Sequence, residues 1–432
     1  MKKKRVSLRL SASAILFLIF SSLPIGAENW YKGNLHSHTF WSDGRQFPEM
    51  VAIWFKEKGY HFLAITDHNA TGTEEKWADI TGPQKKYGVV DSCQKRFGED
   101  NVIIRKEEGK ILAKLKTFAE VRKMVEQPGR FILLQGEELS AKYLDMPVHI
   151  NIININKTVE PVTGTDVAAT LKGNIRLALE AAGETGLVCI NHPNERYAIT
   201  AEDLADSDVF FFEVFNANHA LENLGDARHP GTERMWDIAN SLRLAKRKKG
   251  ICYGLAADDS HYYHEDSSAL GHPGRAFVMV RARDLTVSAI LEALRQGDFY
   301  SSTGVMLKEI TFEPEKKKLT VEVDTEPDTE YTIAFVGTTM DTSVQAETVI
   351  PPQEVPEEYR NRKAPARFTN VYSQEIGKIL FSAKGTRASY TFTGKELYVR
   401  AVITSSKLVS WLPPQAGVYE KAWTQPVVPG GK

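Results

Sequence analysis

The segment Gly33–Gly44 reads GNLHSHTFWSDG, and a second polar segment, AITDHNATG, follows at Ala64–Gly72. Both lie beside short apolar runs that predict strands, so their polar side chains stand near strand ends. Five of these side chains are imidazoles or carboxylates: His36, His38, Asp43, Asp67 and His68. Burying such groups together is costly unless a charge compensates them. A metal ion is the obvious compensating group.

Short apolar runs alternate with amphipathic segments from about residue 30 to residue 305. Runs such as HFLAIT (61–66), FILLQGEEL (131–139), GLVCINH (186–192) and ICYGLAADD (251–259) are typical of buried strands. The segments between them have helical periodicity, and several end in Gly, which favours a helix C-terminus. A repeated order of strand and helix predicts an α/β fold with a largely parallel sheet or barrel.

The composition changes twice along the chain. A polar, Lys-rich stretch at about 78–116 interrupts the alternation and predicts an insertion, either a lid over the site or a solvated excursion. After about residue 305 the pattern has period two and no convincing helix, which predicts a small antiparallel β-domain resembling a sandwich. Because 432 residues exceed one hydrophobic core, we expect an α/β domain over 28–305 and a β-domain over 306–432.

The first 27 residues have the composition of a secretory signal peptide. A basic start, MKKKRVSLRL, precedes the apolar stretch SASAILFLIFSSL and the small residue Ala27. We expect cleavage and a secreted or periplasmic protein without stable membrane insertion; a retained anchor is the alternative. Residues 1–27 contain five basic residues and no acidic one, so the mature chain has a net charge near −6. A net negative charge does not indicate a basic surface of the kind that binds nucleic acid.

Further Asp, Glu and His residues lie at the ends of the later predicted strands: Glu137, Glu138, His192, Asp258, Asp259 and His261 close apolar runs, and His149 opens the run HINIINI. The C-terminal strand ends of an α/β barrel meet at one mouth, so these groups would converge. Imidazoles and carboxylates without thiolates suit Zn, Mn or Fe, and they are too many for one four-coordinate zinc. We therefore predict two or three divalent ions. The three cysteines form no CxxC pair, and the sequence leaves open whether Cys189 and Cys252 pair.

The order HxHT, SDG, TDH, GxE, NHP and DxH resembles the PHP (polymerase and histidinol phosphatase) superfamily over about residues 30–305. The stretch PGRAFVMVRARDLTVSAILEALRQGDFYSSTG (273–304) is similar to a secreted subgroup related to carbaryl hydrolase. The resemblance implies a distorted seven-stranded α/β barrel that binds two or three metals and hydrolyses phosphate esters. It implies nine metal ligands: His36, His38, Asp43, His68, Glu138, His149, His192, Asp259 and His261.

Within that resemblance Glu138 corresponds to the bridging carboxylate. Its neighbour Glu137 would point to the other face of the strand, because side chains alternate. Asp67 and Asp258 stay ambiguous: each could bind an ion directly or orient a ligand, and Asp258 could simply satisfy backbone amides.

The predicted function is a secreted hydrolase of small phosphate esters, with a metal-bridging hydroxide as nucleophile. The proton for the leaving group would come from Asp67, Asp259 or a metal-bound water. Arg45, Arg196 and Arg275 are the candidate phosphate partners, and we take Arg275 as catalytic. His219 is a candidate for the substrate mouth. A carboxyl-ester or carbamate hydrolase is the first alternative; a non-catalytic secreted metal- or carbohydrate-binding protein is the second.

Overall fold

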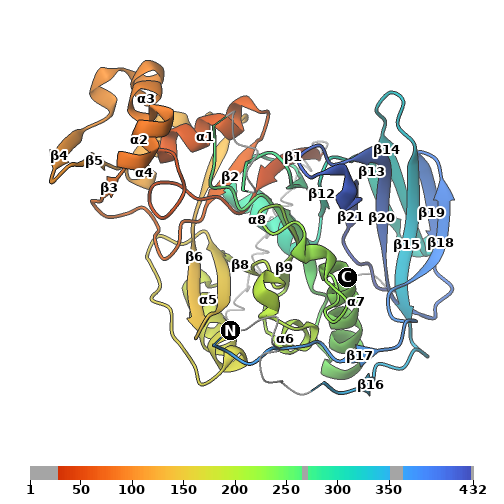
Figure 1. The fold of residues 1–432 in the computed structure, drawn as a ribbon. Coiled ribbons are helices and arrows are strands. Elements are labelled where there is room, and N and C mark those ends of the chain that lie inside the picture. Colours follow the sequence, from red (N-terminus) through yellow and green to blue (C-terminus); the bar gives the residue numbers. More distant parts are fainter. Residues whose placement is uncertain (1–27, 265–270, 351–362, 430–432) are drawn as a thin grey trace, which may run out of the picture.

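The computed structural model describes residues 28–264, 271–350 and 363–429 (Figure 1). The predicted signal peptide, residues 1–27, lies outside the described residues. Among the helices that are described, none has the length and apolar content needed to cross a membrane.

One large sheet runs through the whole molecule. Its strands are β1 (Asn29–Asn34), β2 (Phe62–Ile65), β6 (Ile132–Tyr143), β7 (Met146–Ile153), β8 (Leu187–Ile190), β9 (Phe211–Asn216), β10 (Tyr253–Ala257), β11 (Phe277–Ala282), β12 (Phe299–Ser302), β15 (Tyr331–Thr339), β18 (Lys378–Lys384), β20 (Glu396–Leu408) and β21 (Tyr419–Thr424). Their order is β10-β9-β8-β7-β6-β2-β1-β11-β12-β21-β20-β15-β18. The predicted α/β class with a large sheet is confirmed.

The seven strands from β10 to β1 form an arc. Neighbours pair in parallel except at β7, which is antiparallel to both β6 and β8. The ends of the arc meet beside the HSH motif, where Ser37 and Ser260 form a single parallel bridge and the His38 amide donates to the Ser260 carbonyl at 2.9 Å. Within the described residues, β1 and β10 share no longer ladder.

The interior of the arc is one apolar cluster. Strands from both halves contribute to it, with Phe62, Leu134, Leu187, Phe211 and Leu255 all buried. Helix α8 (Val287–Gln296) adds Ile290, Leu291 and Leu294 to the same cluster. Strands far apart in the sheet order can share one core only if the sheet curls, so the arc is strongly curved.

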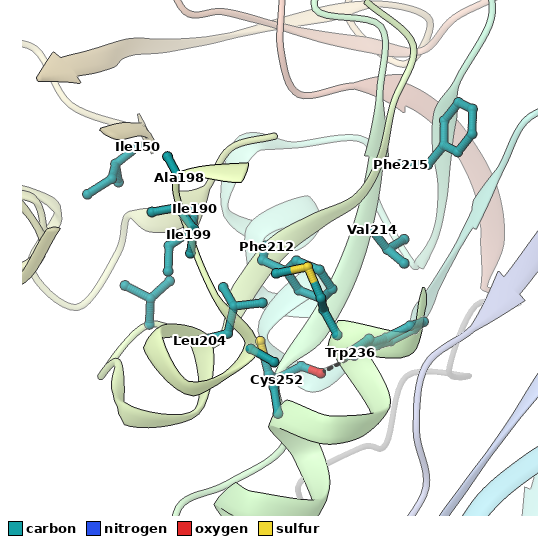
Figure 2. Close-up of a cluster of buried hydrophobic side chains, with 14 of the residues drawn as sticks. Ile150, Ile190, Ala198, Ile199, Leu204, Phe212, Val214, Phe215, Trp236 and Cys252 are labelled. Carbon is teal, nitrogen blue, oxygen red and sulfur yellow. Dashed lines mark hydrogen bonds between the residues drawn. The ribbon is translucent and has the colours of Figure 1, made fainter. Parts of the chain in front are cut away.

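Helices pack on the outer face of the arc: α1 (Pro48–Glu57), α4 (Phe118–Val125), α5 (Val167–Ala182), α6 (Ala201–Asp206) and α7 (Thr232–Leu242). Thr117 and Thr200 begin α4 and α6 with capping boxes, which satisfy free amides of the first turn. Figure 2 shows the outer core, where Phe212 of β9 and Trp236 of α7 pack together and the Trp236 indole donates to the Cys252 carbonyl at 2.7 Å.

The stretch expected as an insertion is a folded unit rather than a plain solvated excursion. It consists of β3 (Trp77–Asp79), α2 (Thr81–Tyr87), α3 (Val89–Phe97), β4 (Ile104–Glu107) and β5 (Lys110–Lys114), with sheet order β3-β5-β4. Its buried side chains share one cluster with Phe40, Trp41 and Phe47. The insertion therefore packs directly on the HSHTFWSDG segment (Figure 1).

The strands after residue 305 are antiparallel and lie in two layers. A three-stranded sheet of β13 (Met306–Glu313), β14 (Lys318–Asp324) and β19 (Arg387–Thr391) faces β15 and β20, and a two-stranded sheet holds β16 (Ala346–Thr348) and β17 (Val371–Tyr372). Strand β21 pairs with β12, so the ladder continues without a break across the expected boundary. Cys93, Cys189 and Cys252 are free and buried; the structure forms no Cys189–Cys252 disulfide.

Candidate metal centre

The HSH motif follows β1, where the backbone is still extended. Ser37 turns away and donates to the Ala64 carbonyl at 2.7 Å, so His36 and His38 face the same side. Both imidazoles are fully buried, and their Nε2 atoms lie 3.1 Å apart. Two ring nitrogens at this distance are well placed to share a proton or a cation.

Glu138 lies at the middle of the cluster. Its Oε2 is 2.8 Å from His68 Nδ1 and 3.5 Å from His38 Nε2. Its Oε1 lies 3.1, 3.3 and 3.4 Å from nitrogens of His192, His149 and His36, respectively. One carboxylate thus faces five imidazoles, two from one oxygen and three from the other. This is the arrangement that a carboxylate bridging two ions requires.

Asp259 and Asp43 complete the set on either side of His38. Asp259 Oδ1 is 3.0 Å from His38 Nε2 and 3.3 Å from His36 Nε2. Asp43 Oδ1 is 3.2 Å from His261 Nε2 and 3.7 Å from His68 Nε2. The Asp43 side chain is 57% exposed, whereas those of His36 and His38 are fully buried. The cluster therefore opens to solvent at Asp43.

The nine predicted ligands form overlapping groups whose ligand atoms lie within 4.8 Å of one another. Four of these groups are His36, His38 and Asp259; His36, Glu138 and His192; His68, Glu138 and His149; and His38, Asp43, His68 and His261. His36, His38, His68 and Glu138 belong to two of these groups each, which suits adjacent ions with shared ligands. The donor set of imidazoles and carboxylates fits Zn, Mn or Fe.

Backbone strain accompanies the site. His192 and Asp259 have φ angles of 22° and 49°, in the left-handed region that few non-Gly residues adopt. Such strain persists where surrounding contacts hold it, often at functional sites. Here the His192 amide donates to Glu213 Oε2 at 2.7 Å, which holds that turn in place.

The groups of the cluster shift one another's pKa values in different directions. Burial alone would raise the pKa of Glu138, but the surrounding imidazoles, His68 first, hold it well below its usual range. Burial and the nearby His261 lower the pKa of His38 to about 3, so this imidazole is neutral and free to offer a lone pair. Burial opposes protonation of His36, yet Asp259 and Glu213 raise its pKa well above the usual value. The carboxylates therefore favour a cation here, as a proton or as a metal ion.

Two carboxylates behind the ligands were missed by the sequence analysis. Glu213 Oε1 lies 2.7 Å from His36 Nδ1, and Glu195 Oε2 lies 3.0 Å from His192 Nδ1. A carboxylate at the far nitrogen fixes the tautomer and leaves Nε2 for an ion. Glu213 lies in the apolar run VFFFEVFN (209–216), and a lone Glu within such a buried strand was the available indication.

The two ambiguous aspartates are tied to the protein backbone and to neighbouring hydroxyls. Asp67 accepts from the Thr39 amide at 2.7 Å, the Thr39 hydroxyl at 2.8 Å and the Ser42 hydroxyl at 2.6 Å. Asp258 accepts from the amides of Gly274, Arg275 and Ala276, each at 2.8 Å. Asp67 therefore holds the ligand segment, and Asp258 holds the loop before β11. Neither belongs to the ligand groups named above, and these bonds occupy Asp67, one of the three predicted sources of the leaving-group proton.

Glu137 and two of the predicted arginines contact groups other than the predicted ligands. Glu137 accepts from the Val159 amide at 2.9 Å on the opposite face of β6. Arg196 pairs with Asp145 at 2.8 Å. The Arg275 guanidinium lies 5.0 Å from the centre of the Trp411 ring. Within the described part of the chain, Arg275 makes no ion pair with a predicted ligand, so its position lends no support to a catalytic role.

Two further predicted positions face the mouth. His219 lies beside the cluster, its ring 4.9 Å from that of His192 and its Nε2 3.9 Å from Asp259 Oδ2. His149 opens its apolar run in the sequence, and it lies in the N-terminal half of β7. Because β7 runs antiparallel to its neighbours, that half lies at the mouth.

No family model and no curated protein matches this chain. Among solved structures it is similar to a two-domain protein containing a predicted PHP-like metal-dependent phosphoesterase from Bacteroides vulgatus, at 12% identity and a TM-score of 0.37, covering 92% of this chain and 95% of that one. A putative metal-dependent phosphoesterase from Bifidobacterium adolescentis (15% identity, TM-score 0.29) and an amidohydrolase from Chromobacterium violaceum (15%, 0.28) each cover 56% of this chain and 89% and 90% of their own. The side-chain geometry, not these similarities, supports the proposal below, and the carbaryl-hydrolase subgroup stays a prediction.

Proposed function

We propose that this protein is a metal-dependent hydrolase that cleaves phosphate esters at a centre of two or three divalent ions. The observation that carries the proposal is the position of Glu138, whose two oxygens face two separate sets of imidazoles. The curved arc of seven strands supports the distorted PHP-type barrel that places these ligands.

Divalent ions at such a centre supply Lewis acidity and lower the pKa of bound water to about 7. The chain's own residues hold and orient the ligands. Glu213 accepts from His36 Nδ1 and Glu195 from His192 Nδ1, so both rings present Nε2 inward. Asp67 holds the segment that carries His38 through Thr39 and Ser42. Asp259 or a metal-bound water would supply the proton for the leaving group, because three short hydrogen bonds already occupy Asp67.

The choice of a phosphate ester rests on Arg45. It is exposed and lies on the rim of the cluster, in the cleft that also contains Asp43. A guanidinium suits a phosphate dianion better than a neutral carbonyl. The engagement of Arg196 and Arg275 elsewhere favours the alternative, a carboxyl ester or carbamate, because fewer cations then face the mouth.

A substrate panel tests the proposal. Protein reconstituted separately with Zn, Mn and Fe would be assayed against 4-nitrophenyl phosphate, 4-nitrophenyl acetate and an aryl carbamate. We expect metal-dependent turnover, with the phosphate preferred. Preference for the acetate or carbamate would select the alternative hydrolase, and turnover of none with any metal would leave a binding protein.

Export is also a proposal, resting on residues 1–27 alone. N-terminal sequencing of the protein recovered from periplasm or medium should begin at Glu28. A protein that retains Met1 and stays with the membrane would show that the segment is an anchor.

A further inference from the structure

A cleft of about 400 Å³ lies beside Asp43, between the ligand segment and the insertion. One wall is formed by Phe40–Arg45, and the other by the start of the insertion with Lys76, Trp77 and Asp79. Asp43 is thus shared by the metal centre and the cleft. A group attached to a substrate at the metal centre can extend into this space, whose volume suits one small ring.

The two walls are fixed to each other. The Lys76 ammonium donates to the Trp41 carbonyl, and its Nζ lies 5.7 Å from the centre of the Trp41 ring. On the far side, the rings of Tyr87 and His264 stack with centroids 3.8 Å apart and planes 10° apart. These contacts tie the insertion to both segments that carry ligands at the mouth. The cleft is therefore a formed feature of the structure rather than a space awaiting closure.

One cation in the cleft is free to bind a ligand. Lys76 is engaged by Trp41, and Asp79 accepts from the amide and hydroxyl of Thr81 at 3.0 and 2.6 Å. The Arg45 side chain is exposed and forms no hydrogen bond or ion pair with any of the described residues, while its amide is held by the His261 carbonyl at 2.8 Å. The backbone of Arg45 is thus fixed at the mouth, and its exposed guanidinium is available to an anion in the cleft.

The Trp77 indole gives the cleft a flat apolar wall. It is half-buried, and the Arg105 guanidinium lies 4.3 Å from the centre of its ring. Aromatic rings pack favourably against such a surface.

We propose that this cleft holds the leaving group of the substrate and selects a planar ring that carries a second anionic group. Arg45 binds that anion, and Trp77 packs against the ring. The inference rests on the proposed hydrolase function, because it places the scissile phosphate at the ligands next to Asp43.

The test compares phenyl phosphate with 4-carboxyphenyl phosphate on the metal-reconstituted full chain. We expect 4-carboxyphenyl phosphate to have a kcat/KM about tenfold higher, the range of one charge-assisted hydrogen bond at a partly exposed site. Arg45→Gln should reduce that preference to near one, chiefly through KM. Trp77→Leu should raise KM for both aryl esters relative to glycerol phosphate.

Arg130→Gln is the matched control. Arg130 is exposed and lies two residues before β6 begins, whereas the ligand Glu138 lies farther along that strand. The preference for 4-carboxyphenyl phosphate should be unchanged in this variant. Equal use of the two esters by the unmodified protein, or a preference that survives Arg45→Gln, would overturn the proposal.

Calorimetry with 4-carboxyphenylphosphonate separates this proposal from the hydrolase function. Binding that weakens about tenfold in Arg45→Gln supports the cleft even if no ester is hydrolysed, in which case only the hydrolase function fails. Ester turnover together with binding that is indifferent to Arg45 would refute the cleft and leave the hydrolase function standing.

Discussion

Within the part of the chain that the structure describes, two buried polar clusters balance their charges differently. Between α7 and the β-strands after residue 305, Asp237 accepts two bonds from Arg400, at 2.7 and 3.0 Å, and one from Tyr398 at 2.8 Å. At the mouth of the arc, by contrast, the two oxygens of Glu138 lie 2.8–3.5 Å from nitrogens of five imidazoles. The first cluster pairs opposite charges within the chain. The second brings together imidazole nitrogens and carboxylate oxygens that can bind a cation.

The difference separates a polar cluster that supports the fold from one built for chemistry. Removing one member of a buried ion pair leaves the other charge buried without its partner and lowers stability. Removing one member of a ligand set lowers cation affinity and relieves crowding among groups that repel or compete. A substitution in the Asp237 cluster should therefore lower stability and spare activity. A substitution in the Glu138 cluster should lower activity and spare stability.

The largest expected effect is on turnover in Glu138→Gln. An amide cannot bridge two cations as a carboxylate does, so turnover should fall roughly a thousandfold or more, beyond the 10–100-fold typical of residues behind the ligands. Steady-state rates with added metal measure this. Glu137→Gln is the matched control, because its side chain faces the other side of β6, and it should stay within a few-fold of the unmodified protein. The reverse order would show that the strand register has been misassigned.

Asp237→Ala should give the largest loss of stability. It leaves the Arg400 guanidinium buried against Trp236, 4.6 Å from the ring centre, without its carboxylate. We expect the free energy of unfolding in urea to fall by about 3–5 kcal/mol, with turnover per folded molecule retained. A drop below 1 kcal/mol, or a loss of bound metal at full stability, would contradict the division between the two clusters.

A smaller effect is expected for Glu213→Gln. Its carboxylate lies 2.7 Å from His36 Nδ1, so the amide weakens the hold on that tautomer. Metal affinity should fall about 10–100-fold, measured by competition with a chelator. Excess metal should restore most of the turnover; turnover that stays absent at saturating metal would indicate a direct part in the reaction.

The smallest effect concerns Glu49, a buried carboxyl in α1 that contacts the insertion through Asn101 at 3.0 Å. Burial raises the pKa of Glu49 above its usual value. The folded state therefore keeps this proton longer than the unfolded state, and stability is lost as the pH rises through the raised pKa. Glu49→Gln should flatten this part of the pH dependence of unfolding. An unchanged slope would mean that the pKa of Glu49 is the same in the folded and unfolded states.

The sequence predicted which ligand candidates lie together better than it predicted the residues that support them. His36 and His38, two residues apart on extended chain, must face one side, and the short motifs after buried strands placed the other ligands at one mouth. The reversed direction of β7 could not be predicted, because its hairpin turns at Leu144, a residue with φ of 54° where Gly or Asn is usual. Glu213 was missed because a lone carboxylate in an apolar run reveals its partner only when the strands are assembled. The continuity of the sheet through β12 and β21 depends on pairing between distant segments.

The most direct test of the account is the metal content of the mature protein, by elemental analysis after purification without chelator, beside that of Glu138→Gln. We predict two or three equivalents of Zn, Mn or Fe per chain, and a loss of at least one equivalent in the variant. Well under one equivalent in the unmodified protein, persisting after incubation with each metal, would contradict the claim that the cluster around Glu138 is a multinuclear metal centre.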